Sequence, residues 1–157
     1  MKILSKLGLA IGFNGEIIVA DTDNNQVHIY SKDGIFLKVI GKHGSKDGEF
    51  MFPLCVAVYK NYNNDQFIAV SDCDNHRIQI FTFPDGKFHS KFGTRGTAPG
   101  GLNKPIGLAF DPCGNILLVD SENDRVQVFS FDGKFIHSFG STGNDNGKFS
   151  KPRFFIY

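Results

Sequence analysis

The 157-residue sequence predicts an all-β fold made of repeated four-stranded antiparallel sheets, and three observations carry this prediction. A ten-residue motif occurs three times, at 21–30, 72–81 and 120–129, with starts 51 and 48 residues apart. Short apolar segments separated by Gly, Asn and Pro turn signals surround each copy, which is typical of strands. No segment shows the 3.6-residue period of a helix. Self-similarity at such a spacing indicates a repeat architecture.

Each unit begins with two apolar strands. The first strand is predicted at 7–11, 54–58 and 106–110, and a turn rich in Asn, Gly or Pro follows it. The second strand is predicted at 17–20, 68–71 and 116–119. This second strand is nearly continuously apolar, as is typical of a strand that is covered on both faces. Each sheet is therefore expected to lie between two packed neighbours.

The third strand of each unit alternates, with Val or Ile on either side of the polar His28, Gln79 and Gln127. An Asp-Gly dipeptide then predicts a hairpin into a fourth strand, expected at 35–40, 87–92 and 134–139. Four antiparallel strands per unit, with a long crossing between units, predict the blades of a β-propeller. The 17 Phe residues are expected to fill the gaps between stacked blades.

Each fourth strand leads into a Gly-rich connection of fixed form. Glycine occupies its first, fourth and eighth positions, and the connection runs on to the proline that opens the next unit. The three Gly-rich segments are 41–48, 93–100 and 140–147, and the prolines are Pro53, Pro105 and Pro152.

Composition limits the function classes. The net charge of +1, with 21% charged residues, gives no overall attraction to nucleic acid or an anionic membrane, and neither DNA nor a membrane is an expected partner. Cys55, Cys73 and Cys113 show no C-x-x-C spacing, so neither a disulfide framework nor a zinc site is expected. A reducing, cytoplasmic location is expected instead. The first twelve residues are interpreted as including a strand rather than a signal peptide, because 7–11 aligns with 106–110. No cofactor and no metal are expected.

The segment from Pro105 to Pro152 resembles an NHL repeat. It contains Ile-Gly-Leu-Ala, then Cys-Gly-Asn-Ile-Leu-Leu-Val-Asp-Ser-Glu-Asn-Asp-Arg-Val-Gln-Val-Phe, then Asp-Gly-Lys-Phe and Phe-Gly-Ser. The resemblance covers nearly the whole chain, three times over, and implies a propeller that usually has six blades. It is similar to the NHL domains at the C-terminus of tripartite-motif (TRIM-NHL) proteins, in which a RING, B-boxes and a coiled coil precede a propeller that binds RNA or protein. The 157 residues contain no RING ligand set, so ubiquitin-ligase activity is expected only through other domains of a full-length relative.

The chain is expected to form one partial NHL propeller over 1–157, with repeats at 7–52, 53–104 and 105–151. Residues 152–157 match the start of a fourth blade. Three blades and a strand do not close a ring, so apolar blade faces and an unpaired edge are expected to be open. Two explanations follow: the sequence is a fragment of a longer protein or a truncated gene model, or two copies associate through the open faces to make six blades.

Strand alternation predicts where a partner binds. It places the acidic turns between strands two and three on the same rim as the Gly-rich connections, and the hairpins on the opposite rim. Long loops on a rigid scaffold favour binding, so the first rim is the predicted site. The candidate partner-binding residues are Asn24, Gln26, Lys42, His43, Asn75, His76, Arg77, Arg95, Lys104, Asn123, Arg125 and Lys148. Those at repeated positions also have a structural interpretation, in which Asp21, Asp72 and Asp120 cap turn amides and Arg77 and Arg125 pair with a carboxylate.

The predicted function is that of a non-catalytic module that recognises a protein or single-stranded RNA, within a TRIM-NHL-like regulator. Formal charge over the turns and connections of the rim totals −1, although part of it forms a basic stripe. The stripe consists of Arg95, Lys104, Lys148, Lys151 and Arg153. The alternative is a propeller enzyme, such as a metal-dependent lyase or hydrolase. The five histidines occupy unmatched positions in the three units, which favours the non-catalytic interpretation.

Overall fold

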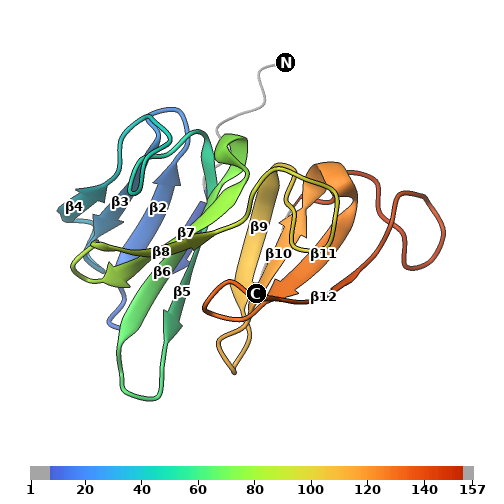
Figure 1. The fold of residues 1–157 in the computed structure, drawn as a ribbon. Coiled ribbons are helices and arrows are strands. Elements are labelled where there is room, and N and C mark those ends of the chain that lie inside the picture. Colours follow the sequence, from blue (N-terminus) through green and yellow to red (C-terminus); the bar gives the residue numbers. More distant parts are fainter. Residues whose placement is uncertain (1–7, 154–157) are drawn as a thin grey trace.

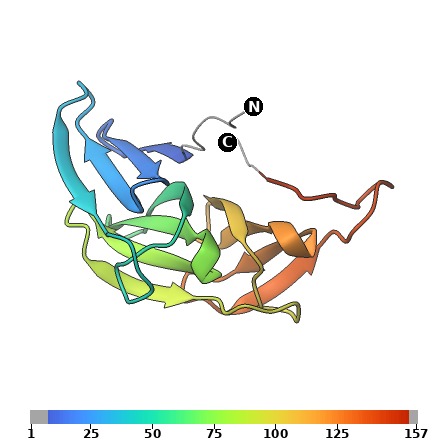
Figure 2. The same ribbon diagram turned by 90° about the horizontal axis from the view of Figure 1, so that it is seen from above.

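The computed structural model describes residues 8–153, which form three four-stranded antiparallel sheets side by side in an arc (Figures 1 and 2). The first sheet contains β1 (Gly8–Ile11), β2 (Ile17–Asp21), β3 (Gln26–Tyr30) and β4 (Phe36–Ile40). The second contains β5 (Pro53–Lys60), β6 (Gln66–Asp72), β7 (Arg77–Phe83) and β8 (Phe88–Phe92). The third contains β9 (Pro105–Phe110), β10 (Ile116–Asp120), β11 (Arg125–Phe129) and β12 (Phe135–Phe139). The predicted all-β fold of four-stranded propeller blades is confirmed.

Strands follow one another in each sheet in sequence order, so every blade is a simple meander. One-turn helices, η1 (Cys73–Asn75) and η2 (Ser121–Asn123), lie in the acidic turns of the second and third blades. The residue after each helix, His76 or Asp124, has a left-handed backbone with φ near 50°. The expected start of a fourth blade falls largely on 154–157, which lie outside the described residues, as does Leu7 of the first predicted strand.

The hydrophobic core lies between blades. Ile18 and Val27 of the first blade pack with Ile68 and Phe81 of the second. A second cluster joins Ala69, Ile78 and Ile80 of the second blade to Leu108, Leu118 and Phe129 of the third. Full burial of one such aliphatic or aromatic side chain contributes about 1.5–3 kcal/mol, so stacking of the blades is the main source of stability.

The phenylalanines behave in two ways. Phe50, Phe81 and Phe129 are almost fully buried between blades, as expected. Phe36 and Phe135, on the outer strands β4 and β12, are 53% and 36% exposed. The expectation that Phe fills the gaps is therefore confirmed for the inner positions and wrong for these outer ones, because a fourth strand has no further strand beyond it.

The two rims have the predicted composition. The turns between the second and third strands contact the Gly-rich connections, as the hydrogen bond from Asn75 to the carbonyl of Gly44 shows. We call this end of the sheets the turn rim. The β1–β2 and β3–β4 hairpins lie together at the other end, where a Cβ at Gly15 would lie 3.1 Å from Cβ of Lys32. In residues 8–153 no helix is long and apolar enough to cross a membrane.

Candidate functional site

A buried ionic network holds the turn rim together in the second blade. Asp72 has no exposed surface and accepts hydrogen bonds from Nε of Arg77 and from the amide N–H of Met51, both at 2.7 Å. The Arg77 guanidinium also donates to three carbonyl oxygens of the 41–52 connection, each at 2.8 Å. Arg77 is only 7% exposed. The side chain thus fastens the connection to the blade that follows it.

Gln79 completes this clamp from the third strand. Its side-chain amide donates to the carbonyl of Glu49 at 2.7 Å, and its carbonyl accepts from the N–H of Gly48 at 2.9 Å. Gln79 is fully buried, so both groups need these partners. Gly48 has φ of 78°, a conformation that favours glycine. The Gly-rich pattern and the polar residue in the middle of the third strand therefore belong to one structural device.

The third blade repeats the clamp on the 93–104 connection. Arg125 pairs with buried Asp120 at 2.8 Å and donates to three carbonyls of the connection. Gln127 bonds to Gly101 and receives the N–H of Gly100. The predicted pairing of Arg77 and Arg125 with a carboxylate is confirmed. A role in partner binding stays a prediction for Arg77 and Arg125. It also stays a prediction for Asn75 and Asn123, whose side-chain amides donate hydrogen bonds to carbonyl oxygens of the connections.

The first blade carries different residues in the corresponding places. Gln26 replaces the arginine and His28 replaces the glutamine, and the two side chains are 3.1 Å apart. Asn24 donates to Asp21 at 2.8 Å. These side chains bond to one another, so Asn24 and Gln26 occupy the positions of the clamp residues without holding a connection within residues 8–153.

Three other predicted residues lie on the connections, the neighbours Lys42 and His43 on 41–52 and Lys148 on 140–152. Lys42 is 74% exposed and lies 3.5 Å from Glu49, while Lys148 pairs with Asp145 at 2.7 Å. His43 is exposed and lies on the same connection as Lys42. Exposed ion pairs of this kind contribute little to stability, so both lysines are available to a partner.

The structure brings His76, which follows the acidic turn of the second blade, together with Arg95 and Lys104 of the 93–104 connection. The backbone N–H of Lys104 donates to Nδ1 of His76 at 3.2 Å. Partial burial lowers the pKa of His76, and the charges of Arg95 and Lys104 lower it further, against the opposing effect of Asp74. Because Nδ1 accepts a hydrogen bond, the neutral ring carries its proton on Nε2, free to donate to a ligand.

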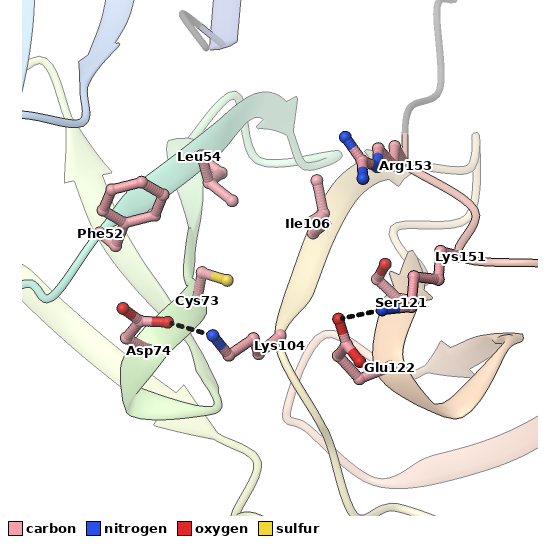
Figure 3. A pocket seen from close by; sticks show the side chains of 10 residues that line it. All are labelled: Phe52, Leu54, Cys73, Asp74, Lys104, Ile106, Ser121, Glu122, Lys151 and Arg153. Atoms are coloured by element: carbon pink, nitrogen blue, oxygen red, sulfur yellow. Dashed lines mark ion pairs between the residues drawn. The ribbon is translucent and has the colours of Figure 1, made fainter. Parts of the chain in front are cut away.

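A pocket of about 290 Å³ opens next to this cluster (Figure 3). Its floor is apolar, formed by Leu54, Cys73 and Ile106. Two ion pairs, Lys104 with Asp74 at 3.3 Å and Lys151 with Glu122 at 3.6 Å, lie at its wall. The remaining lining residues are Phe52, Ser121 and Arg153. The pocket therefore combines an apolar base with cations held in exposed, weakly bound pairs.

Phe52 is the aromatic residue among the lining residues that sequence reasoning missed. It occupies the same repeat position as Lys104 and Lys151, immediately before the proline that opens the next unit. All three have a left-handed backbone, with φ of 61°, 54° and 48°. Alignment of the repeats could have found Phe52, because this position faces the pocket in each unit. Within residues 8–153, no group of three His, Cys, Asp or Glu side chains is placed to hold a metal ion.

Comparisons with known proteins identify the repeat. The family model for the NHL repeat matches residues 102–129, and that for a 6-bladed beta-propeller matches 4–64. The chain is 34% identical over 133 residues to Protein brain tumor of Drosophila melanogaster, covering 85% of this chain and 12% of the relative. The chain belongs to the NHL-repeat β-propellers. Its NHL repeats are also 32% identical over 132 residues to B-box type zinc finger protein ncl-1 of Caenorhabditis elegans, covering 84% and 15%.

Solved structures share the propeller fold of these NHL repeats. A streptogramin B lyase matches with a TM-score of 0.66 and 16% identity, over 98% of this chain and 46% of its own. Kuenenia stuttgartiensis hydrazine synthase matches with a TM-score of 0.68 and 11% identity, over 98% and 40%. Such low identity shows the fold alone. The homologues are TRIM-NHL proteins, so this NHL propeller segment is an interaction module.

Proposed function

We propose that the turn rim recognises single-stranded RNA, as the target-binding part of a cytoplasmic TRIM-NHL-like regulator. The observation that carries the proposal is the cluster of His76, Arg95 and Lys104 beside the pocket that contains Phe52. Single-stranded RNA is bound by cations that contact phosphates and by rings on which bases stack. Cys55 and Cys113 are free thiols, which supports a reducing compartment.

The charges around the pocket are available to phosphates. Arg95 is exposed and forms no ion pair with a carboxylate of residues 8–153, and the same holds for Arg153. Lys104 and Lys151 are 50% and 63% exposed, so a phosphate can replace their acidic partners at small cost. The pocket volume is close to the lower limit for ligand pockets, about 300 Å³. This size suits one nucleotide unit rather than a duplex.

Fluorescence anisotropy with a labelled ten-nucleotide single-stranded RNA pool tests the proposal. We expect micromolar binding by wild type at 50 mM salt and marked weakening at 200 mM. Each phosphate contact contributes about −0.7 to the slope of log affinity against log salt, so Arg95→Ala/Lys104→Ala should make the slope shallower by about 1.4. The double variant should bind at least tenfold more weakly than wild type.

Lys32→Ala/Lys87→Ala is the matched control, because it removes the same charge from exposed residues at the opposite rim. Its affinity should stay within twofold of wild type. Circular dichroism establishes that each protein is folded. Folded wild type that shows no binding at 50 mM salt disproves RNA recognition and leaves a protein as the partner of the rim.

A further inference from the structure

A second pocket, of about 280 Å³, lies among the hairpins at the end of the sheets opposite the turn rim. Phe13 comes from the turn after β1, Tyr59 and Lys60 from the end of β5, and Asp111 and Pro112 from the turn after β9. These turns lie at the lower end of the sheets in Figure 1. We call this site the hairpin pocket. All three described blades contribute to it, so it spans both joints between them.

Aromatic rings form a wall of the hairpin pocket and continue into the core. Tyr59 and Phe110 stack with ring centroids 5.0 Å apart and ring planes at 22°. Phe131 packs on Tyr59 at 5.7 Å and on buried Phe67 at 4.8 Å. Phe13, from the first blade, is 47% exposed. Rings that are already held in place lose little freedom when a ligand packs against them, which favours binding.

Two hydrogen-bond donors at the hairpin pocket have no partner. Within residues 8–153, the hydroxyl of Tyr59 and the ammonium of Lys60 form neither a hydrogen bond nor an ion pair. The Lys60 ammonium lies 5.8 Å from the ring centroid of Phe13. Both donors are therefore available to the carbonyl oxygens of a ligand that lies across the rings.

The charge around the hairpin pocket is complementary to a basic ligand. Four lysines and six carboxylates, a net charge of −2, occupy the six hairpins of the three blades, at 12–16, 31–35, 60–65, 84–87, 111–115 and 130–134. Asp111 lines the pocket, and Glu16 belongs to the same turn as Phe13. Burial acts to raise the pKa of Asp111, but hydrogen bonds, chiefly from Asn115, outweigh it and lower this pKa. The pKa of Glu16 is lowered by the same balance, with Asn14 among the donors. Both carboxylates are therefore ionised at neutral pH.

We propose that the hairpin pocket binds a proline-rich segment of a partner protein that carries arginine or lysine beside its prolines. Such segments dock in grooves lined by aromatic rings. Their extended backbone has no internal hydrogen bonds, so its carbonyl oxygens accept from Tyr59 and Lys60. Proline rings pack against Phe13 and Tyr59, and a basic side chain pairs with Asp111. The excess of carboxylates disfavours phosphates here, so this site is separate from the RNA site proposed for the turn rim.

Selection of a random twelve-residue peptide display library on folded 1–157 tests the proposal. We expect the enriched peptides to contain two prolines three residues apart together with arginine or lysine. The most enriched peptide, synthesised with a fluorescent label, should bind with a dissociation constant below about 1 mM in anisotropy titrations. Replacement of its arginine and lysine residues by glutamate should weaken binding by about tenfold or more.

Variants locate the peptide on the protein. Phe13→Ala should weaken binding of the selected peptide by about tenfold or more, because it removes a ring of the pocket. Tyr59→Phe removes only the hydroxyl, and should weaken binding about three- to tenfold. Phe36→Ala is the matched control, because it removes a ring of similar exposure, 53%, from the outer strand β4, and it should bind as wild type does. Arg95→Ala/Lys104→Ala should also bind the peptide as wild type does, which separates this site from the turn rim.

Circular dichroism of each variant separates loss of binding from loss of folding. The proposal is overturned by a selection that enriches no peptide, or by enriched peptides that lack proline or carry a net negative charge. Unchanged affinity in either Phe13→Ala or Tyr59→Phe also overturns it. Loss of RNA binding with retention of peptide binding overturns only the function proposed for the turn rim.

Discussion

Removal of the Arg77 guanidinium is the sharpest test of the clamp. Arg77→Ala deletes the ion pair with Asp72 at 2.7 Å and three hydrogen bonds to the 41–52 connection. The variant leaves a carboxylate with no exposed surface and removes its nearest cation. The loss falls on the joint between the first and second blades.

The expected cost is about 3–4 kcal/mol. Breaking one partner of a buried ion pair costs about 3–5 kcal/mol, because the remaining charge stays buried. The Met51 amide, Asn75 and Gln79 continue to donate to Asp72, which keeps the cost in the lower part of this range. Domains of this size are stable by about 5–15 kcal/mol, so the variant should fold but be much less stable.

Urea unfolding followed by circular dichroism measures the effect. With an m-value of about 2 kcal/mol/M, the midpoint should fall by about 2 M. Arg95→Ala removes the same charge from an exposed side chain, and its free energy of unfolding should change by less than about 0.5 kcal/mol. A loss below about 1 kcal/mol in Arg77→Ala would show that the guanidinium acts only as a surface pair, and would refute the clamp.

Three further outcomes are expected. Gly41→Ala should destabilise the fold by more than Gly48→Ala, because both glycines have positive φ but a Cβ at Gly41 would collide with the buried ring of Phe50. Paired urea unfolding curves measure the difference. Exposed Cys113 should react with a thiol reagent in the native state well before buried Cys73, and equal rates would contradict this burial. The pKa of His76 is lowered, so the stability that its neutral ring contributes is present above about pH 6.5 and is lost as pH falls through the folded-state value. RNA affinity should rise over the same interval, and both effects should disappear in His76→Asn; Arg95, Lys104, Asp74 and Asp120 act on this ring.

The strands could be predicted from the sequence because their signals are local. Period-two alternation around His28, Gln79 and Gln127, followed by Asp-Gly hairpins, marked the positions of β3, β7 and β11. Pairing of Arg77 and Arg125 with a carboxylate also followed from the repeated motif. In these cases the interacting residues are close in sequence or recur at a fixed spacing.

The role of the polar strand residues could not be predicted in the same way. Gln79 alternates with apolar neighbours, a pattern that by itself indicates a solvent-facing side chain, yet it is fully buried. Its partners are backbone groups of Gly48 and Glu49, about thirty residues earlier. Backbone partners have no residue signature in the sequence. The meeting of His76 with Lys104 depends likewise on how two blades stack, which no local pattern encodes.

The measurement that tests the central claim most directly is a map of where RNA contacts the protein. Ultraviolet cross-linking of the labelled single-stranded RNA pool to 1–157, followed by peptide mass spectrometry, provides it. We predict adducts in the peptides that contain Phe52, His76 and residues 95–104, with loss of these adducts in Arg95→Ala/Lys104→Ala. Adducts confined to the hairpin rim, around Phe13 or Tyr62, or unchanged by the double variant, would contradict recognition through the turn rim.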